Sequence, residues 1–257
     1  MTQDLLTALR AQTPLVHCIT NYVAMNVAAN VVLAAGASPA MVHAPEELDS
    51  FTPMCGALTV NIGTLSAPWV DSMTRAAQVA RANEIPWVLD PVAHFISGFR
   101  SSAAQELLAL GPSILRGNAS EIITLAGQAG SGKGADSGDS VADAEDAARA
   151  LARDRGLVVA VTGPQDFVTD GTRSAHVAGG SELMPKVTAL GCSQTALMGA
   201  YAAVGPAFDA ALAALAHFKL AGTRAAARAE GPGSFQVHFL DALAAVQPGE
   251  LYAAVRA

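Results

Sequence analysis

Short apolar runs alternate along this chain with longer stretches of helical periodicity, and this alternation restricts the possible folds more than any other feature. Runs of strand length occur at 15–19, 40–42, 58–62, 87–89, 113–115 and 157–161. Helical stretches are expected at 2–10, 21–35, 67–83, 119–126 and 141–153, and over most of the chain after residue 193. Strand–helix–strand order predicts the α/β class, with a mostly parallel central sheet and helices on both faces.

The run 157–161 is continuously apolar and rich in valine, which is typical of a strand buried on both faces. Asp170-Gly171 predicts a hairpin turn between the two strands that follow. The segment 127–140 is rich in Gly and Ser and is expected to be a mobile surface loop. Because the strand–helix rhythm resumes after this loop, residues 1–257 are expected to form a single domain.

Charge and cysteine content exclude several classes of function. The net charge is −7 and no run of Lys or Arg occurs, so no nucleic-acid partner is expected. Three cysteines without CxxC spacing argue against disulfides or zinc and favour a reducing, cytoplasmic location. The N-terminus has no apolar core of signal-peptide length. The apolar stretch 22–42 contains Asn26, Asn30, Gly36 and Pro39, which disfavour a membrane span.

Ligands of open α/β sheets bind beyond the carboxyl ends of the strands, so polar residues that follow apolar runs are the candidates for a site. Asp90 ends the run 87–89 and could either cap a turn or hold a hydrated Mg²⁺. Asn118 and Glu121 have the spacing of a helix capping box. In the functional alternative, Arg116 pairs with phosphate and Glu121 with hydrated Mg²⁺.

Two further segments have the composition of a phosphate contact. Thr162, followed by Gly163-Pro164, ends the most apolar run and is either a plain turn or a nucleotide contact. The small residues of 187–195 precede a long apolar helix, whose first amides and dipole suit an anion. Cys192 is expected there to have a lowered pKa and to accept a proton, or else to be an inert, buried small residue.

Taken in order, these segments resemble the hydroxyethylthiazole kinase family of the ribokinase-like superfamily over roughly residues 5–243. The resemblance is carried by Val16-His17-Cys18-Ile19-Thr20-Asn21-Tyr22-Val23, Gly36-Ala37-Ser38-Pro39-Ala40-Met41, Asn61-Ile62-Gly63-Thr64, Leu89-Asp90-Pro91-Val92, Arg116-Gly117-Asn118-Ala119-Ser120-Glu121, Gly132-Lys133-Gly134, Val161-Thr162-Gly163, Gly191-Cys192 and Gly231-Pro232-Gly233-Ser234-Phe235. Each motif is weak alone, but the ordered set is specific.

The resemblance implies a ribokinase-like fold, a homotrimer with active sites between subunits, and phosphorylation of hydroxyethylthiazole, a thiamin precursor, with ATP and Mg²⁺. It also implies a role for each candidate residue, and a closing movement of the loop around Gly132-Lys133 over the nucleotide. By position, the residues are Asn21, Val23, Met41 and Ala189 for the thiazole, Arg116 and Thr162 for ATP, Asp90 and Glu121 for the metal, and Gly191 and Cys192 for catalysis.

One departure from the family pattern is visible. The family's helix-start motif usually reads Gly-x-Gly-Cys, whereas this chain has Ala189-Leu190-Gly191-Cys192. Alanine adopts a positive φ less readily than glycine, so rate or acceptor could differ. Two alternatives stay open: a related kinase for the pyrimidine half of thiamin, and a non-catalytic nucleotide-binding protein. A nicotinamide dehydrogenase is disfavoured, since no G-x-G-x-x-G joins an early strand to a helix.

Overall fold

The computed structural model describes residues 5–128, 130–132 and 137–256. Within these residues one nine-stranded sheet has the order β2-β1-β3-β4-β5-β6-β7-β8-β9. The first six strands of this order are parallel, and β7, β8 and β9 continue antiparallel from β6. The strands are β1 (Leu15–Ile19), β2 (Ser38–Ala40), β3 (Ala57–Asn61), β4 (Trp87–Asp90), β5 (Ile114–Asn118), β6 (Val158–Thr162), β7 (Asp166–Thr169), β8 (Ser174–Val177) and β9 (Val255–Arg256).

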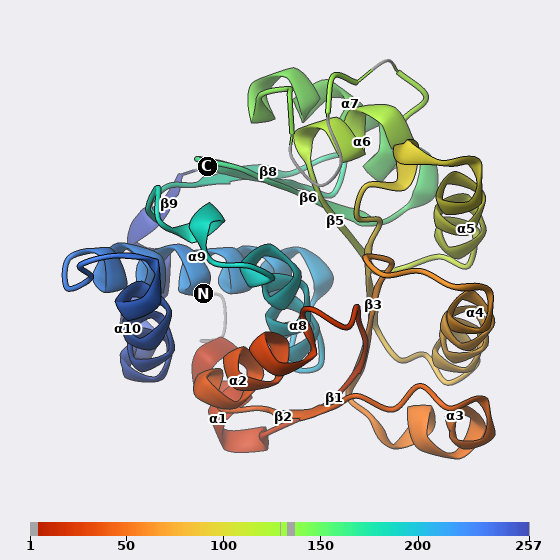
Figure 1. Ribbon diagram of the computed structural model, residues 1–257, viewed down its shortest axis with the longest axis horizontal. Helices are drawn as coiled ribbons and strands as arrows, with labels where there is room; N and C mark the ends of the chain where they lie inside the picture. Colours follow the sequence, from red (N-terminus) through yellow and green to blue (C-terminus); the bar gives the residue numbers. More distant parts are fainter. Residues whose placement is uncertain (1–4, 129, 133–136, 257) are drawn as a thin grey trace.

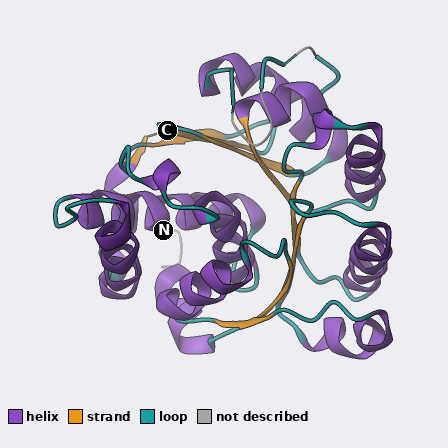
Figure 2. Cartoon of the chain, in the orientation of Figure 1, coloured by secondary structure: helices purple, strands orange, loops and turns teal. Residues whose placement is uncertain are grey.

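Helices cover both faces of the curved sheet (Figure 1). The convex face carries α3 (Pro45–Phe51), α4 (Ala67–Ala82), α5 (Gly98–Ala109), α6 (Ala119–Leu125) and α7 (Val141–Arg155). The concave face holds α1 (Leu5–Gln12), α2 (Met25–Ala35), α8 (Leu190–Ala202), α9 (Ala207–Ala226) and α10 (Pro232–Ala245), as Figure 2 shows. Short 3₁₀ turns are η1 (Thr52–Met54), η2 (His94–Ile96), η3 (Met184–Lys186) and η4 (Pro248–Ala254).

The sheet separates two apolar cores. Successive side chains of a strand point to opposite faces, so Val88 and Ala160 pack with the helices of the concave face, whereas Leu89 and Val159 pack with those of the convex face. Both cores exclude water, and the central strands are accordingly apolar along most of their length. The predicted α/β class and helix coverage of both faces are therefore confirmed.

Some element boundaries differ from the sequence expectations. The second strand lies at Ser38–Ala40, two residues earlier than predicted. Its residues are only half-buried at the sheet edge, so the apolar pattern there is weak. Asn21 does accept a hydrogen bond from the amide of Ala24, but the helix starts only at Met25. Helices α3 and α5 were not predicted from the sequence, whereas the hairpin at Asp170-Gly171 is confirmed between β7 and β8.

None of the described helices combines the length and the apolar character that crossing a bilayer requires.

Candidate active site

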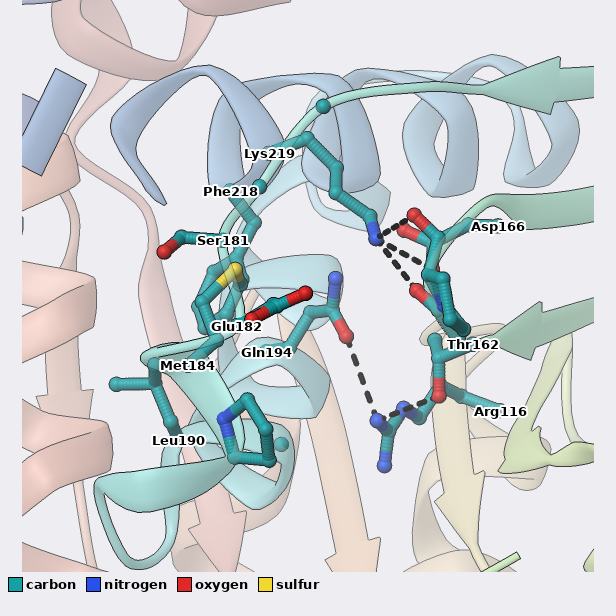
Figure 3. A pocket seen from close by; sticks show the side chains of 16 residues that line it. Arg116, Thr162, Asp166, Ser181, Glu182, Met184, Leu190, Gln194, Phe218 and Lys219 are labelled. Atoms are coloured by element: carbon teal, nitrogen blue, oxygen red, sulfur yellow. Dashed lines mark hydrogen bonds and ion pairs between the residues drawn. The ribbon is translucent and has the colours of Figure 1, made fainter. Parts of the chain in front are cut away.

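The predicted polar residues meet at one edge of the sheet, where β3, β4, β5 and β6 end and α8 begins. Strand register places Asn118 opposite Thr162, and it places Asp90 opposite Asn61, which was not predicted as a site residue. A cavity of about 580 Å³ opens at this edge. Its walls come from the ends of β5 and β6, the connection from β8 to α8, the start of α8 and the middle of α9 (Figure 3).

Asp90 is completely buried at the end of β4. Its Oδ2 atom accepts hydrogen bonds from Asn61 Nδ2 at 2.7 Å and Thr195 Oγ1 at 2.7 Å. The guanidinium of Arg116 lies beside the same oxygen, with an Nη1–Oδ2 distance of 3.3 Å. The other carboxylate oxygen, Oδ1, has no hydrogen-bond partner among the described residues. Burial raises the pKa of Asp90, and the neighbouring guanidinium opposes that rise.

Glu121 lies at the start of α6, and the predicted capping box is confirmed. Asn118 Oδ1 accepts from the amide of Glu121 at 2.9 Å, and Glu121 Oε2 accepts from the amide of Asn118 at 2.8 Å. Its second oxygen accepts from the amide of Ala93 at 2.9 Å, which ties α6 to the turn after Asp90. Burial, and then the charge of Asp90, raise the pKa of Glu121 to about 7. The capping box uses one oxygen of Glu121 for the amide of Asn118 and leaves the metal role of this residue a prediction.

Arg116 and Thr162 form one wall of the cavity. Arg116 Nη2 donates to Thr162 Oγ1 at 2.7 Å, and Figure 3 shows the two side chains side by side. The same nitrogen approaches Gln194 Oε1 of α8 at 3.4 Å. Burial alone would lower the pKa of Arg116, but the carboxylates of Asp90 and Glu121 raise it. The guanidinium therefore stays charged at the cavity wall.

The residue before α8 has a positive φ, the backbone conformation that costs alanine more free energy than glycine. Ala189 occupies the residue before the helix with φ 61° and ψ 4°, in the left-handed region. Gly191 faces Arg116, since an ideal Cβ there would lie 3.3 Å from Nη2. The first amides of a helix have no intrahelical partner, so they are available to an anion in the cavity that Leu190 and Gly191 line.

Cys192 is half-buried beside Asn21, whose Nδ2 atom lies 3.4 Å from Sγ. The expectation of a lowered pKa at this residue is wrong. Burial, followed by the charge of Asp90, raises the pKa of Cys192, with opposition from Arg116. Desolvation of the thiolate and the charge of Asp90 thus outweigh the opposing charge of Arg116.

The residues predicted to bind the thiazole lie in different environments. Asn21 is buried and donates from Nδ2 to Asn61 Oδ1 at 2.8 Å, so it joins the Asp90 network to Cys192. Met41 is half-buried against the concave-face core. Val23 is 55% exposed at the surface, and the neighbouring Tyr22 is 63% exposed. The structure of one chain therefore brings Asn21 to Cys192 and leaves Val23 facing outward.

The Gly- and Ser-rich segment is described only in part, and Lys133 lies outside the described residues. Its described ends are anchored to the start of α6. Asp139 Oδ2 accepts from Ser120 Oγ at 2.6 Å and from the amide of Ser131 at 2.8 Å.

Several residues of the cavity were not predicted from the sequence. Asp166, Gln194 and Lys219 line the cavity, and Asn61 and Thr195 donate to Asp90 at the same edge of the sheet. A signal existed for one of them, because Lys219 is an isolated charge in the otherwise apolar middle of α9. The others resemble ordinary polar residues of strand ends and helices until their neighbours are known.

The fold is that of the ribokinase-like kinases, and the polar edge of the sheet with its cavity lies where such a fold binds ligands. The fold is shared with a pyridoxal kinase from Staphylococcus aureus, solved in complex with AMP-PCP and pyridoxal, at a TM-score of 0.63 and 17% identity over 81% of this chain and 87% of that one. The family model for hydroxyethylthiazole kinases matches residues 6–249. The chain belongs to the hydroxyethylthiazole kinase family.

Relatives agree with this membership over the full length. A hydroxyethylthiazole kinase from Roseobacter denitrificans is 74% identical over 98% of both chains. The structure of a hydroxyethylthiazole kinase protein from Pyrococcus horikoshii superposes with a TM-score of 0.90, at 38% identity over 98% of this chain and 97% of that one.

Proposed function

We propose that this chain transfers the terminal phosphoryl group of ATP to the hydroxyethyl group of 4-methyl-5-(2-hydroxyethyl)thiazole, in thiamin salvage. The observation that carries the proposal is the cavity that runs from the Arg116–Thr162 pair to Leu190 and Gly191 at the start of α8, where Cys192 is the next residue of the chain. The whole chain acts as one kinase domain, since even β9 near the C-terminus pairs within the single sheet.

The nucleotide lies in the 580 Å³ cavity, which is large enough for a small-molecule ligand. Arg116 contacts a phosphate, because its guanidinium stays charged and is aimed along the wall. Thr162 orients Arg116 and offers its own hydroxyl at the rim. Catalysis of phosphoryl transfer depends mainly on such positioning and on neutralisation of phosphate charge.

Asp90 and Glu121 fit a hydrated Mg²⁺. Asp90 Oδ1 is a buried oxygen with no hydrogen-bond partner among the described residues. Burial and the charge of Asp90 raise the pKa of Glu121, and a nearby cation would favour its charged form. The described residues contain no group of three His, Cys, Asp or Glu side chains able to enclose a metal. One or two carboxylates, with water and phosphate oxygens, are the usual set for Mg²⁺. The ion supplies charge neutralisation to the phosphates.

Gly191 and the amides at the start of α8 stabilise the phosphoryl group as it moves. Cys192 faces the acceptor hydroxyl and takes its proton at Sγ. Asn21 holds that sulfur in place through its 3.4 Å contact. Because the pKa of Cys192 is raised, the thiolate fraction at neutral pH is small, and the base contributes more as pH increases.

The thiazole ring binds beside Asn21, Val23, Met41 and Ala189 in a homotrimer that places active sites between subunits. The exposed apolar side chains of Tyr22 and Val23 support this arrangement, since a neighbouring subunit would cover them. The three cysteines are free thiols, which suits a reducing cytoplasm.

A coupled ADP-release assay tests the proposal directly. Purified protein with Mg²⁺-ATP is given hydroxyethylthiazole, hydroxymethylpyrimidine or no acceptor. ADP release that depends on the thiazole supports the proposal, whereas release with the pyrimidine alone supports the related kinase. ATP binding without release for any acceptor would contradict the proposal and favour a non-catalytic protein with a disabled helix start.

A further inference from the structure

Lys219 places a buried ammonium group in the wall of the nucleotide cavity. Its side chain starts on α9 and crosses toward the turn after β6 (Figure 3). The Nζ atom donates to the carbonyl oxygens of Gly163 at 2.5 Å and Pro164 at 2.9 Å, and lies 3.3 Å from Asp166 Oδ1. Lys219 and Asp166 are only 4% and 1% exposed. This position is therefore an enclosed, oxygen-lined cation site that the protein fills with its own side chain.

The three oxygens account for the whole donor capacity of the ammonium. A lysine ammonium has three N–H donors and no acceptor, and three acceptors surround it here. No donor remains for a phosphate, although Lys219 lines the cavity. Burying a charge is costly without such partners. The arrangement therefore points to a role in holding the wall and not to direct contact with the nucleotide.

The turn that the ammonium holds follows Thr162 directly. The carbonyl oxygens of Gly163 and Pro164 both accept from Nζ, so the ammonium bridges two consecutive residues of the turn. Asp166 closes the turn from the other side, because its Oδ1 atom also accepts from the amide of Gly163 at 2.9 Å. Displacement of this turn would move Thr162 away from Arg116.

The backbone of Lys219 reaches the opposite wall. Its carbonyl oxygen accepts from the amide of Gly180 at 3.1 Å, and Gly180 also donates to Thr223 Oγ1 at 2.9 Å. Gly180 lies in the connection from β8 to α8, which lines the same cavity. One residue of α9 thus fixes the distance between two walls, with its side chain on one and its main chain on the other.

We propose that Lys219 is a positioning residue that acts as a built-in monovalent cation, which holds the turn after Thr162 in the conformation that binds the nucleotide. Binding at this wall consequently needs no dissolved monovalent cation. The inference rests on the proposed function to the extent that the nucleotide occupies this cavity. An ion pair that merely stabilises the fold would not respond to a replacement cation, and this difference provides the test.

The experiment measures the Kd of Mg²⁺-ADP by calorimetry for wild type and Lys219→Ala. Each protein is studied in tetramethylammonium chloride, whose cation is too large for the vacated space, and in ammonium chloride of equal ionic strength. Lys186→Ala is the matched control, since it removes one lysine charge from an exposed site in η3 near the cavity. Circular dichroism measures whether each variant is folded.

Lys219→Ala is expected to bind ADP about tenfold more weakly in tetramethylammonium, and ammonium should restore much of that loss. Wild type and Lys186→Ala should bind equally in both salts. An unchanged Kd for Lys219→Ala, or weaker binding that does not respond to ammonium, would overturn this inference and leave the proposed function standing. Failure of wild type to bind ADP would overturn the proposed function together with it.

A paired substitution keeps the inference testable if the single variant does not fold. Lys219→Met with Asp166→Asn removes both buried charges, so no unpaired carboxylate remains. This pair should fold, bind ADP about tenfold more weakly than wild type and ignore ammonium. Binding as tight as in wild type would show that the cation at this position does not support the nucleotide site.

Discussion

The guanidinium Nη1 of Arg116 lies 3.3 Å from Oδ2 of Asp90, and the two form an ion pair from which water is almost wholly excluded. Removing one partner of such a pair leaves the other charge buried. We expect Arg116→Met to lower the free energy of unfolding by about 3–5 kcal/mol. Adding Asp90→Asn in the same chain should recover part of that loss, as urea denaturation would show.

An ion pair at the surface provides the control for these substitutions of Arg116 and Asp90. Arg75 and Asp49 form a salt bridge at 2.6 Å, but both side chains are more than half exposed. Arg75→Met should leave the free energy of unfolding almost unchanged, because exposed pairs are screened by water. Strict additivity of the Asp90 and Arg116 substitutions would contradict the coupling inferred from their contact.

Replacement of Cys192 tests the proposed proton acceptor. We expect kcat of the wild type to rise with pH above neutrality, because only the deprotonated thiol accepts a proton and its pKa is raised. Cys192→Ala should lose about 10²–10⁴-fold in kcat and show a flatter pH profile. Cys55→Ala removes a thiol before β3 and away from the site edge. It should keep the wild-type kcat and the wild-type pH profile. A loss below about tenfold for Cys192→Ala would leave only a positioning role.

Ala189 provides a test of backbone strain, because it is an alanine with φ 61°. Ala189→Gly should raise the free energy of unfolding by about 0.5–1 kcal/mol, as glycine adopts this conformation without a Cβ penalty. Ala150→Gly in the interior of α7 places glycine in an ordinary helical conformation. It should lower the free energy of unfolding by about 1 kcal/mol. Thermal and urea unfolding measure both changes. Destabilisation by Ala189→Gly would mean that the helix start is not strained.

The raised pKa of Glu121 predicts a pH dependence of stability with a definite sign. The folded chain binds this proton more tightly than the unfolded chain, since the pKa rises from 4.5 to about 7. The stability that Glu121 contributes is therefore complete below pH 4.5 and is lost as pH rises through about 7. Urea titrations of wild type and Glu121→Gln at several pH values isolate this term.

The expected result is that the stability of wild type relative to Glu121→Gln falls across that pH range. Mg²⁺ with ADP should reduce the fall in wild type, because a nearby cation favours the charged carboxylate. A difference that stays constant or grows with pH would contradict the assignment of the shift to burial and to Asp90.

Val23 tests the proposed subunit interface, since it is 55% exposed although apolar. Val23→Glu should shift a trimer toward monomers in sedimentation velocity and raise KM for the thiazole while KM for ATP changes less. Phe99→Glu alters another exposed apolar residue, on α5 of the opposite helix layer. It should leave the oligomeric state and the KM for the thiazole unchanged. A wild-type monomer that is fully active would show that the site is complete within one chain.

Local pattern was sufficient for much of the fold and part of the site. Short apolar runs that alternate with longer helical periods predicted the α/β class, because run length and β-branched residues separate buried strands from helices. Asn118 and Glu121 were predicted as a capping box because the bonds lie within one helical turn. The cost of a positive φ at Ala189 was raised only through the resemblance, because the family's motif usually has glycine at this position.

Tertiary structure decided what depends on residues far apart in the chain. The pKa of Cys192 rises because of burial and the charge of Asp90, and neither is visible in its neighbours along the chain. Lys219 reaches Gly163 across 56 positions of sequence. The sequence alone determined most of the elements, though not α3 or α5, and which polar residues follow the strands. Only the packed fold determined their solvation and partners, because these depend on distance in space.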